Sequence, residues 1–326
     1  LRVDRANPFR GNADQFHGLG VDVKYGITGQ LTLDATINPD FGQVEVDPAV
    51  VNLTQYETFY VERRPFFVEG AEIFRYGFPG VGLNNPDLGS LFYSRRIGRA
   101  PHRDLEGPQV QYADVPGQTT IAGAAKISGR IGDAWSVGLM EAVTLEEEGR
   151  LVDPDGTRQS AIVEPLSNYL VGRARRDFRE GNSTVGAIVT AVNRDLGEPV
   201  LEEMLHSGAY VAGVDFNHMW KNREWFVNGT ITGSRVQGSP EAILLTQRSS
   251  ARYWQRPDAG HVAVDPTRTA IHGWRGSLSA GRRSGDHWLG SVLFQAQSPG
   301  FEANDLGFET RVDSWDGNFY LQYLET

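Results

Sequence analysis

Cysteine is missing from the sequence, so the chain has no disulfides, no thiolate metal ligands and no thiol nucleophile. Lysine is scarce, because only Lys24, Lys126 and Lys221 are lysines among the 31 basic residues. The rigid forks of the arginines suit pairing with carboxylates, although genomic base composition explains the same bias. Acidic residues number 41 and the formal net charge is −10, which argues against a nucleic-acid partner, since phosphate binding needs a basic face.

Long apolar runs are also missing, and no stretch of about 20 residues predicts a transmembrane helix. The first residues, LRVDRANPFRGNADQ, are polar and do not form a signal peptide. The last residues, GNFYLQYLET, stop inside a predicted strand. We therefore expect the sequence to be a fragment of a longer chain.

What the sequence does contain is alternation of apolar and polar residues with a period of two. The stretch LTLDATI at residues 31–37 shows it clearly, and the same pattern recurs at residues 210–217, 225–232 and 274–280. No stretch keeps a helical period. This alternation predicts an all-β, antiparallel fold with one apolar face and one polar face.

The connections between the predicted strands alternate between short and long. Short turns lie near residues 26–30, 130–135, 178–183, 220–225 and 282–288, and long loops lie at residues 145–168, 194–207, 237–269 and 298–310. Tryptophans flank the short turns, at Trp135, Trp220, Trp225 and Trp288. Tight turns on one side, long loops on the other and an aromatic girdle are typical of outer-membrane barrels. The sequence predicts a single domain over residues 1–326, a partial transmembrane β-barrel of about a dozen strands.

Residues 38–90, here called the insert, break this pattern. They are rich in charges and aromatic rings, have no period, and follow an Asn-Pro pair that ends a strand. We expect the insert to lie in the barrel lumen or to cap one mouth, and the alternative is an outer loop packed on itself. Its charges and two arginines that follow it predict an ion-pair network for binding or gating, tied to strand residues such as Arg130, Arg173, Arg175 and Asp215. The members of this network are Asp40, Glu45, Asp47, Glu57, Glu62, Arg63, Arg64, Glu69, Arg95 and Arg96.

Three stretches resemble a bacterial family, the domain of unknown function 5916. They are NPDFGQVEVDPAVVNLTQYETFYVERRPFFVEG at residues 38–70, LFYSRRIGRAP at residues 91–101 and SPGFEANDLGFETRVD at residues 298–313. The resemblance implies an outer-membrane β-barrel of Gram-negative bacteria. It also implies an upstream β-sandwich similar to family 9 carbohydrate-binding modules. It implies no activity, because none is established for the family.

Motifs for catalysis are few. The pairs Glu45/Asp47 and Glu57/Glu62 are nominal candidates for glycoside hydrolysis, but acids this close to arginines favour structural ion pairs. Asp40, with the first of these pairs, could hold a hard cation such as calcium, although the spacing matches no calcium loop. The seven histidines show no zinc spacing. No catalytic, cofactor-binding or metal residue is therefore assigned, and no cofactor is expected.

The function predicted from the sequence is passage or reception of a solute at the bacterial outer membrane. The expected partners are outer-membrane lipid, a saccharide ligand and the upstream carbohydrate-binding-like domain. A membrane-anchored polysaccharide hydrolase and a structural anchor barrel remain open as alternatives. A secreted all-β protein such as a propeller is disfavoured, because no repeat of about 40 to 50 residues is present.

Overall fold

The computed structural model describes residues 8–9, 20–39, 51–55, 57–77 and 90–325. Its strands are β1 (Val21–Gly26), β2 (Leu31–Ile37), β3 (Tyr112–Asp114), β4 (Ile121–Ile131), β5 (Trp135–Thr144), β6 (Glu147–Val152), β7 (Arg158–Glu164), β8 (Ser167–Phe178), β9 (Ser183–Arg194), β10 (Gly208–Trp220), β11 (Trp225–Gln237), β12 (Ala270–Arg282), β13 (Trp288–Gln297) and β14 (Ser314–Tyr323). Its helices are α1 (Pro65–Val68), α2 (Pro199–Met204) and α3 (Pro240–Arg248), with 3-10 turns η1 (Ala71–Phe74) and η2 (Ser94–Arg96).

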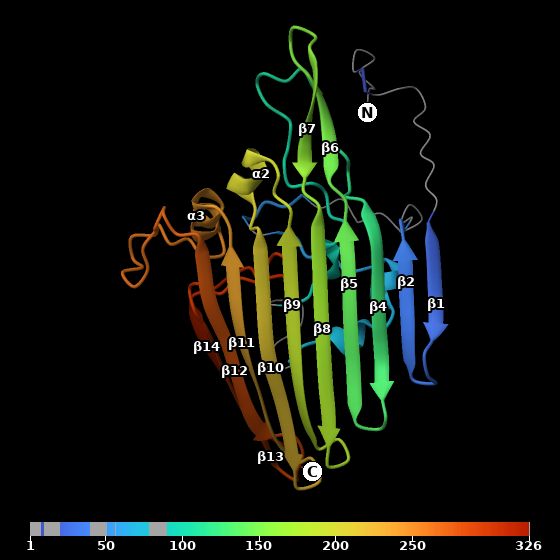
Figure 1. Cartoon of the computed structure of the whole chain (residues 1–326). Helices are drawn as coiled ribbons and strands as arrows, with labels where there is room; N and C mark the ends of the chain where they lie inside the picture. The colour runs from blue at the N-terminus through green and yellow to red at the C-terminus, as the bar shows by residue number, and fades with distance from the viewer. Residues whose placement is uncertain (1–7, 10–19, 40–50, 56, 78–89, 326) are drawn as a thin grey trace.

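Eleven strands form one antiparallel sheet in the order β1-β2-β4-β5-β8-β9-β10-β11-β12-β13-β14. The predicted all-β antiparallel fold is confirmed. The sheet curves, so that β14 lies behind β12 at the left of the view (Figure 1). β1 and β14 are its two edges and are not paired with each other, so the described sheet is open and not a closed barrel. No helix in the described ranges is long and apolar enough to cross a membrane.

Short turns lie at one end of this sheet and long connections lie at the other (Figure 1). Two of the turns, at residues 179–181 and 221–223, are built from consecutive left-handed residues, with φ between 49° and 79°. The long connections carry α2, α3 and the β6–β7 hairpin, which pairs with β3 in a second, three-stranded sheet. The predicted rhythm of short turns and long loops is therefore present in the structure.

One face of the large sheet is exposed, and other parts of the chain pack on the opposite face. One face, called here the open face, carries apolar side chains that nothing described covers, such as Val189, Ile231 and Phe294, which are 48%, 56% and 50% exposed. The charged side chains on the open face are Glu141, Arg176, Arg235 and Arg282, each near the end of its strand. This distribution is the reverse of a sheet face in contact with water.

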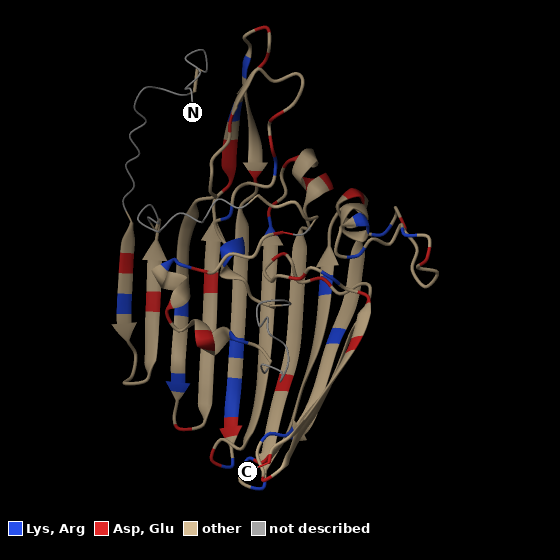
Figure 2. Cartoon of the chain, turned by 180° about the vertical axis from the view of Figure 1, so that it is seen from behind, with Lys and Arg blue, Asp and Glu red and all other residues tan. Residues whose placement is uncertain are grey.

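The opposite, covered face carries buried polar side chains on its strands, including Lys126, Arg173, Thr190 and Asp215. Residues 57–77, the longest described part of the insert, lie against this face (Figure 2). Two strand glycines make the approach possible. A Cβ added at Gly138 would lie 2.9 Å from the ring of Phe74, and one at Gly213 would lie 2.6 Å from the Tyr76 hydroxyl.

The hydrophobic core lies between the covered face and the layer formed by the insert and the long connections. Its largest cluster joins strand residues such as Met140 and Val171 to Phe67 and Phe74 of the insert and to Leu306. Residues 90 and 308 form an isolated antiparallel bridge that links the last residue of the insert to the β13–β14 connection. Residues 57–77 of the insert are therefore part of the packed core and not of a separate lobe.

Candidate functional site

Glu62 and Arg64 form the most fully hydrogen-bonded pair of the insert. Both Glu62 carboxylate oxygens accept from the Arg64 guanidinium, at 2.9 and 2.7 Å, and Ser94 Oγ donates to Oε2 at 2.6 Å. Arg64 also donates to the carbonyls of Ser94 and Ile97, at 2.8 and 2.7 Å. Burial alone would raise the pKa of Glu62, but these donors outweigh it and hold the pKa below its usual value. The pair connects the start of α1 to η2.

The other predicted pairs of the insert are spread along it. Arg96 binds both carboxylate oxygens of Glu57, at 2.8 and 2.7 Å, and its Nε donates to the carbonyl of Gly307 at 3.0 Å. Arg95 donates to the carbonyl of Val61, and the backbone N–H of Arg63 donates to Glu62. The predicted residues Asp40, Glu45 and Asp47 lie outside the described residues.

The strands hold the insert by its backbone carbonyls, and this differs from the expected arginine–carboxylate pairs. Lys126 Nζ donates to the carbonyls of Phe66 and Glu69, both at 2.6 Å, while the Glu69 carboxylate pairs with Lys24 at the surface. Arg173 binds Asp215 through both guanidinium nitrogens, at 2.6 and 2.8 Å, and its Nε donates to the carbonyl of Arg75 at 3.0 Å. Asp34 of β2 neutralises Lys126, and Asp215 of β10, two strands away, neutralises Arg173, so the remaining donors of both cations bind neutral acceptors.

Two further strand residues named from the sequence make no hydrogen bond or ion pair with the described residues of the insert. Arg130 donates to the carbonyl of Asp133 in a short turn, and Arg175 pairs with Asp177 at 3.9 Å on its own strand. Both lie toward the turn end of the sheet. The network around the insert is thus confined to the middle and the loop end of the covered face.

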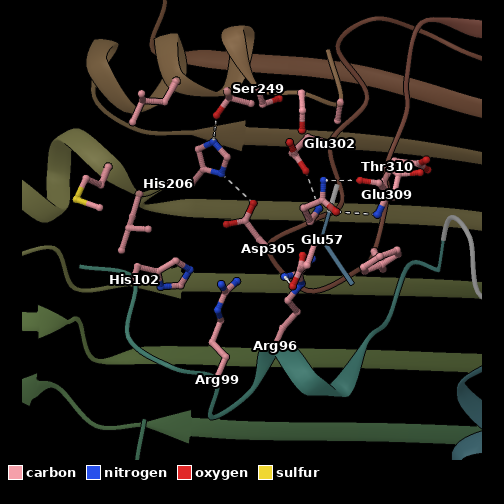
Figure 3. A pocket seen from close by; sticks show the side chains of 18 of the residues that line it. Glu57, Arg96, Arg99, His102, His206, Ser249, Glu302, Asp305, Glu309 and Thr310 are labelled. Atoms are coloured by element: carbon pink, nitrogen blue, oxygen red, sulfur yellow. Dashed lines mark hydrogen bonds and ion pairs between the residues drawn. The ribbon is translucent and has the colours of Figure 1, made fainter. Parts of the chain in front are cut away.

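A pocket of about 350 Å³ opens at the loop end of the covered face (Figure 3). Its charged and imidazole side chains come from four separate segments: the insert, the segment after it, the β9–β10 connection and the β13–β14 connection. They are Glu57, Arg96, Arg99, His102, Arg194, His206, Glu302, Asp305 and Glu309. Tyr169, Ser249, Ser250, Asn304 and Phe308 also line the pocket.

Asp305 lies between two cations at the wall of this pocket (Figure 3). It accepts from Arg194 at 2.6 Å and from His206 Nδ1 at 2.8 Å. The other ring nitrogen of His206 lies 2.7 Å from the hydroxyl of Thr246, which donates its own proton to the carbonyl of Ala242. Each ring nitrogen of His206 therefore faces an acceptor, and this geometry favours the protonated ring. Burial would lower the pKa of His206, but Asp305 outweighs it and raises the pKa, and the two cations in turn lower the pKa of Asp305.

Two more carboxylates of the pocket are neutralised by arginines behind them. Glu302 and Arg252 are 2.6 Å apart and both side chains are almost fully buried. Glu309 lies 2.7 Å from Arg275 of β12. Burial raises the pKa of Glu309, although the Arg275 guanidinium opposes the shift. Together with Glu57 and Asp305, every carboxylate that lines the pocket has a cationic partner.

Arg99 is different, because its guanidinium forms no ion pair or side-chain hydrogen bond with a described residue. Figure 3 shows it pointing into the pocket, on the side of His102. The neighbouring His102 is held by Glu164, which accepts from the ring Nδ1 at 2.7 Å and from the backbone N–H at 2.8 Å. Burial lowers the pKa of His102, and burial followed by the Arg96 guanidinium lowers the pKa of Arg99. An arginine keeps its charge at neutral pH in spite of such a shift.

The sequence did not single out the pocket, although two of the quoted stretches contain most of its charges. Arg96 and Arg99 belong to LFYSRRIGRAP, and Glu302, Asp305 and Glu309 belong to the stretch at residues 298–313. The sequence could have indicated the pocket only if these two stretches and the insert had been expected to meet in space. Arg194 and His206 carry no local signal, since they lie at the ends of one ordinary loop.

Metal binding has no support in the described ranges, where no three His, Asp or Glu side chains group closely enough to hold an ion. No curated protein and no solved structure matches the chain. A family described as a domain of unknown function, DUF5916, matches residues 4–326, which is nearly the whole chain. The chain therefore belongs to the DUF5916 family.

Proposed function

We propose that the chain forms the wall of an outer-membrane β-barrel that receives a solute, with the insert inside the wall and the pocket at its loop end. The observation that carries the proposal is the open face. Its apolar side chains cover strands of 10 to 13 residues from β4 to β14 of the large sheet, and its charges lie near strand ends. A strand of about 9 to 11 tilted residues spans a bilayer. An apolar face of this size is stable in contact with lipid acyl chains and unfavourable in contact with water.

The tryptophans at the short turns support the same orientation. Trp135, Trp225 and Trp288 begin their strands and Trp220 ends its strand, all at the turn end of the sheet. Trp135, Trp220 and Trp288 are 41%, 40% and 53% exposed. Aromatic residues at one level form the girdle that meets the lipid headgroups. In this orientation the long connections and the pocket lie on the outer side.

Reception of a solute is supported by the covered face. A wall that served only as an anchor would need no charged pocket and no insert tied to strand cations. Here fixed arginines and acids line the approach, and such rings of charge select solutes in channels. A saccharide is the class we propose, since the family resemblance implies a carbohydrate-binding-like domain upstream. A hydrolase is less well supported, because each carboxylate of the pocket is already held by a cation of its own.

The first test is the mobility of the full-length protein from an outer-membrane fraction on a cold detergent gel, with and without boiling. A folded barrel should migrate differently before boiling, and its membrane fraction should resist extraction by high salt. Unchanged mobility together with recovery in the aqueous fraction would overturn the membrane proposal. Conductance in a planar bilayer then tests solute passage, and a folded barrel that conducts nothing would favour the anchor.

A further inference from the structure

We propose that the pocket binds an oxyanion, the carboxylate or phosphate group of a small solute, with the Arg99 guanidinium as its anchor. This inference deepens the proposed function by naming the chemical class of the solute, and it rests on that function for the route by which the solute arrives. The binding step itself depends only on the geometry of the pocket.

The first argument is the balance of charge inside the pocket. Glu57, Glu302, Asp305 and Glu309 are each bound by an arginine at 2.6 to 2.8 Å, and Asp305 binds the His206 imidazolium as well. Arg99 has no such contact with a described side chain. A cation that has lost much of its hydration without gaining a partner is unfavourable, so the site is completed by an anion from outside.

The second argument is the environment of that cation. Burial and Arg96 lower the pKa of Arg99, while Glu57 and Glu164 act in the opposite direction. Arg96 and Arg194 line the same pocket as Arg99, so three guanidinium groups bring positive charge to one volume. The acids that could cancel it are turned toward their own partners. Glu164 holds His102 by its ring and its backbone, and Glu57 is bound by both nitrogens of Arg96. The guanidinium of Arg99 is therefore the charge of the pocket that faces the open volume without a bound carboxylate.

The third argument is the shape and lining of the site. A guanidinium is planar and presents a fork of donors that matches carboxylate and phosphate oxygens in pairs. A volume of about 350 Å³ is at the lower end of the range for small-molecule sites. Ser249 and Ser250 offer hydrogen bonds to hydroxyl groups, and Leu245, which is 54% exposed, offers an apolar surface. Such a site fits an acidic sugar or a sugar phosphate better than a bare ion.

The test measures binding by calorimetry with full-length protein in detergent, using galacturonate, its neutral counterpart galactose, and inorganic phosphate. We expect saturable binding of galacturonate or phosphate, and at least about tenfold weaker binding of galactose. Arg99→Gln should weaken anion binding by about tenfold to a hundredfold and leave the galactose signal unchanged. Arg99→Lys keeps the charge but not the fork, so it should recover part of the affinity.

Arg158→Gln serves as the matched control, because it removes one exposed arginine from the start of β7, away from the pocket. It should bind like the unaltered protein. Galacturonate alone would identify a carboxylate as the ligand and phosphate alone a phosphate group. No saturable binding of either anion at millimolar concentration by folded protein, or an equal loss in both glutamine variants, would overturn the inference.

The outcome is separable from that of the proposed function. A heat-modifiable protein that binds neither anion would retain the membrane proposal and refute the oxyanion site. A protein that binds galacturonate through Arg99 but shows no heat-dependent mobility would retain the site and refute the barrel. Folding of each variant is checked by circular dichroism, and Arg99→Gln should not lower the melting temperature, since no described partner is lost.

Discussion

Lys126 should control whether the insert stays docked on the covered face. Its side chain is 2% exposed and its Nζ donates to the carbonyls of Phe66 and Glu69, both at 2.6 Å. It also lies 3.5 Å from Asp34 and 4.9 Å from the centre of the Phe66 ring. We therefore expect Lys126→Met to release the insert locally while the sheet remains folded.

The size of the effect follows from the contacts that are lost. A hydrogen bond to a charged group contributes about 1.5 to 3 kcal/mol, so the two bonds of Lys126 to the insert contribute about 3 to 6 kcal/mol. Each 1.4 kcal/mol is a factor of ten in an equilibrium constant. Amide hydrogen exchange in residues 64–74 should therefore accelerate by about a hundredfold to ten-thousandfold. Exchange in the middle of β9 and β10 should change little.

Two companion variants make this measurement specific. Lys24→Met removes an exposed lysine that also pairs with Glu69, and it should leave the exchange of the insert unchanged because exposed ion pairs contribute little. Lys126→Met combined with Asp34→Asn should be less destabilised than Lys126→Met alone, because it no longer leaves a buried carboxylate without its lysine. Unaltered exchange in residues 64–74, with faster exchange in the strands, would refute the docking role of Lys126.

Three other outcomes are expected. Gly213→Ala should displace Tyr76 from the sheet at a cost of about 1 to 3 kcal/mol, and the insert should then be cleaved faster by a protease. Gly233→Ala on the same sheet should not have this effect, because the nearest atom to its added Cβ is 4.0 Å away. Val189→Arg on the open face should destabilise the membrane-inserted protein by about 2 to 4 kcal/mol, measured by urea unfolding from vesicles. Glu180→Arg in a short turn should not destabilise it. Equal stability of the two variants would indicate that the open face is in contact with water. The pKa of Glu62 in the folded protein lies below the unfolded value of 4.5. Glu62 therefore stabilises the insert above pH 4.5, and this stabilisation is lost as the pH falls through the folded pKa. Protection of the insert from protease that does not weaken in acid would contradict this prediction.

The strands and their turns were predictable because they depend on short-range patterns. The alternation in LTLDATI decides which side of β2 carries Asp34, and consecutive turn residues such as those at 179–181 decide where a strand reverses. Each of these signals is contained in fewer than about ten residues and needs no knowledge of neighbours.

The contacts of the insert were harder to predict, since the acceptors are backbone carbonyls. The sequence marks Lys126 and Arg173 as cations on one face of their strands, but every residue has a carbonyl, so it does not mark Glu69 or Arg75 as the acceptors. The sequence suggested carboxylate partners instead. The structure shows that other strands had already supplied these, as Asp215 of β10 does for Arg173 of β8.

By itself, the sequence determined that the chain is an antiparallel sheet with an apolar face, short turns at one end and a charged insert near its start. Only the tertiary structure decided that the insert lies on the covered face and that a pocket forms where four distant segments meet. The reason is the range of the interactions. Strand periodicity is local. That Arg99 has no carboxylate partner depends on long-range contacts, because Arg96, Arg194 and His206 bind the nearby carboxylates.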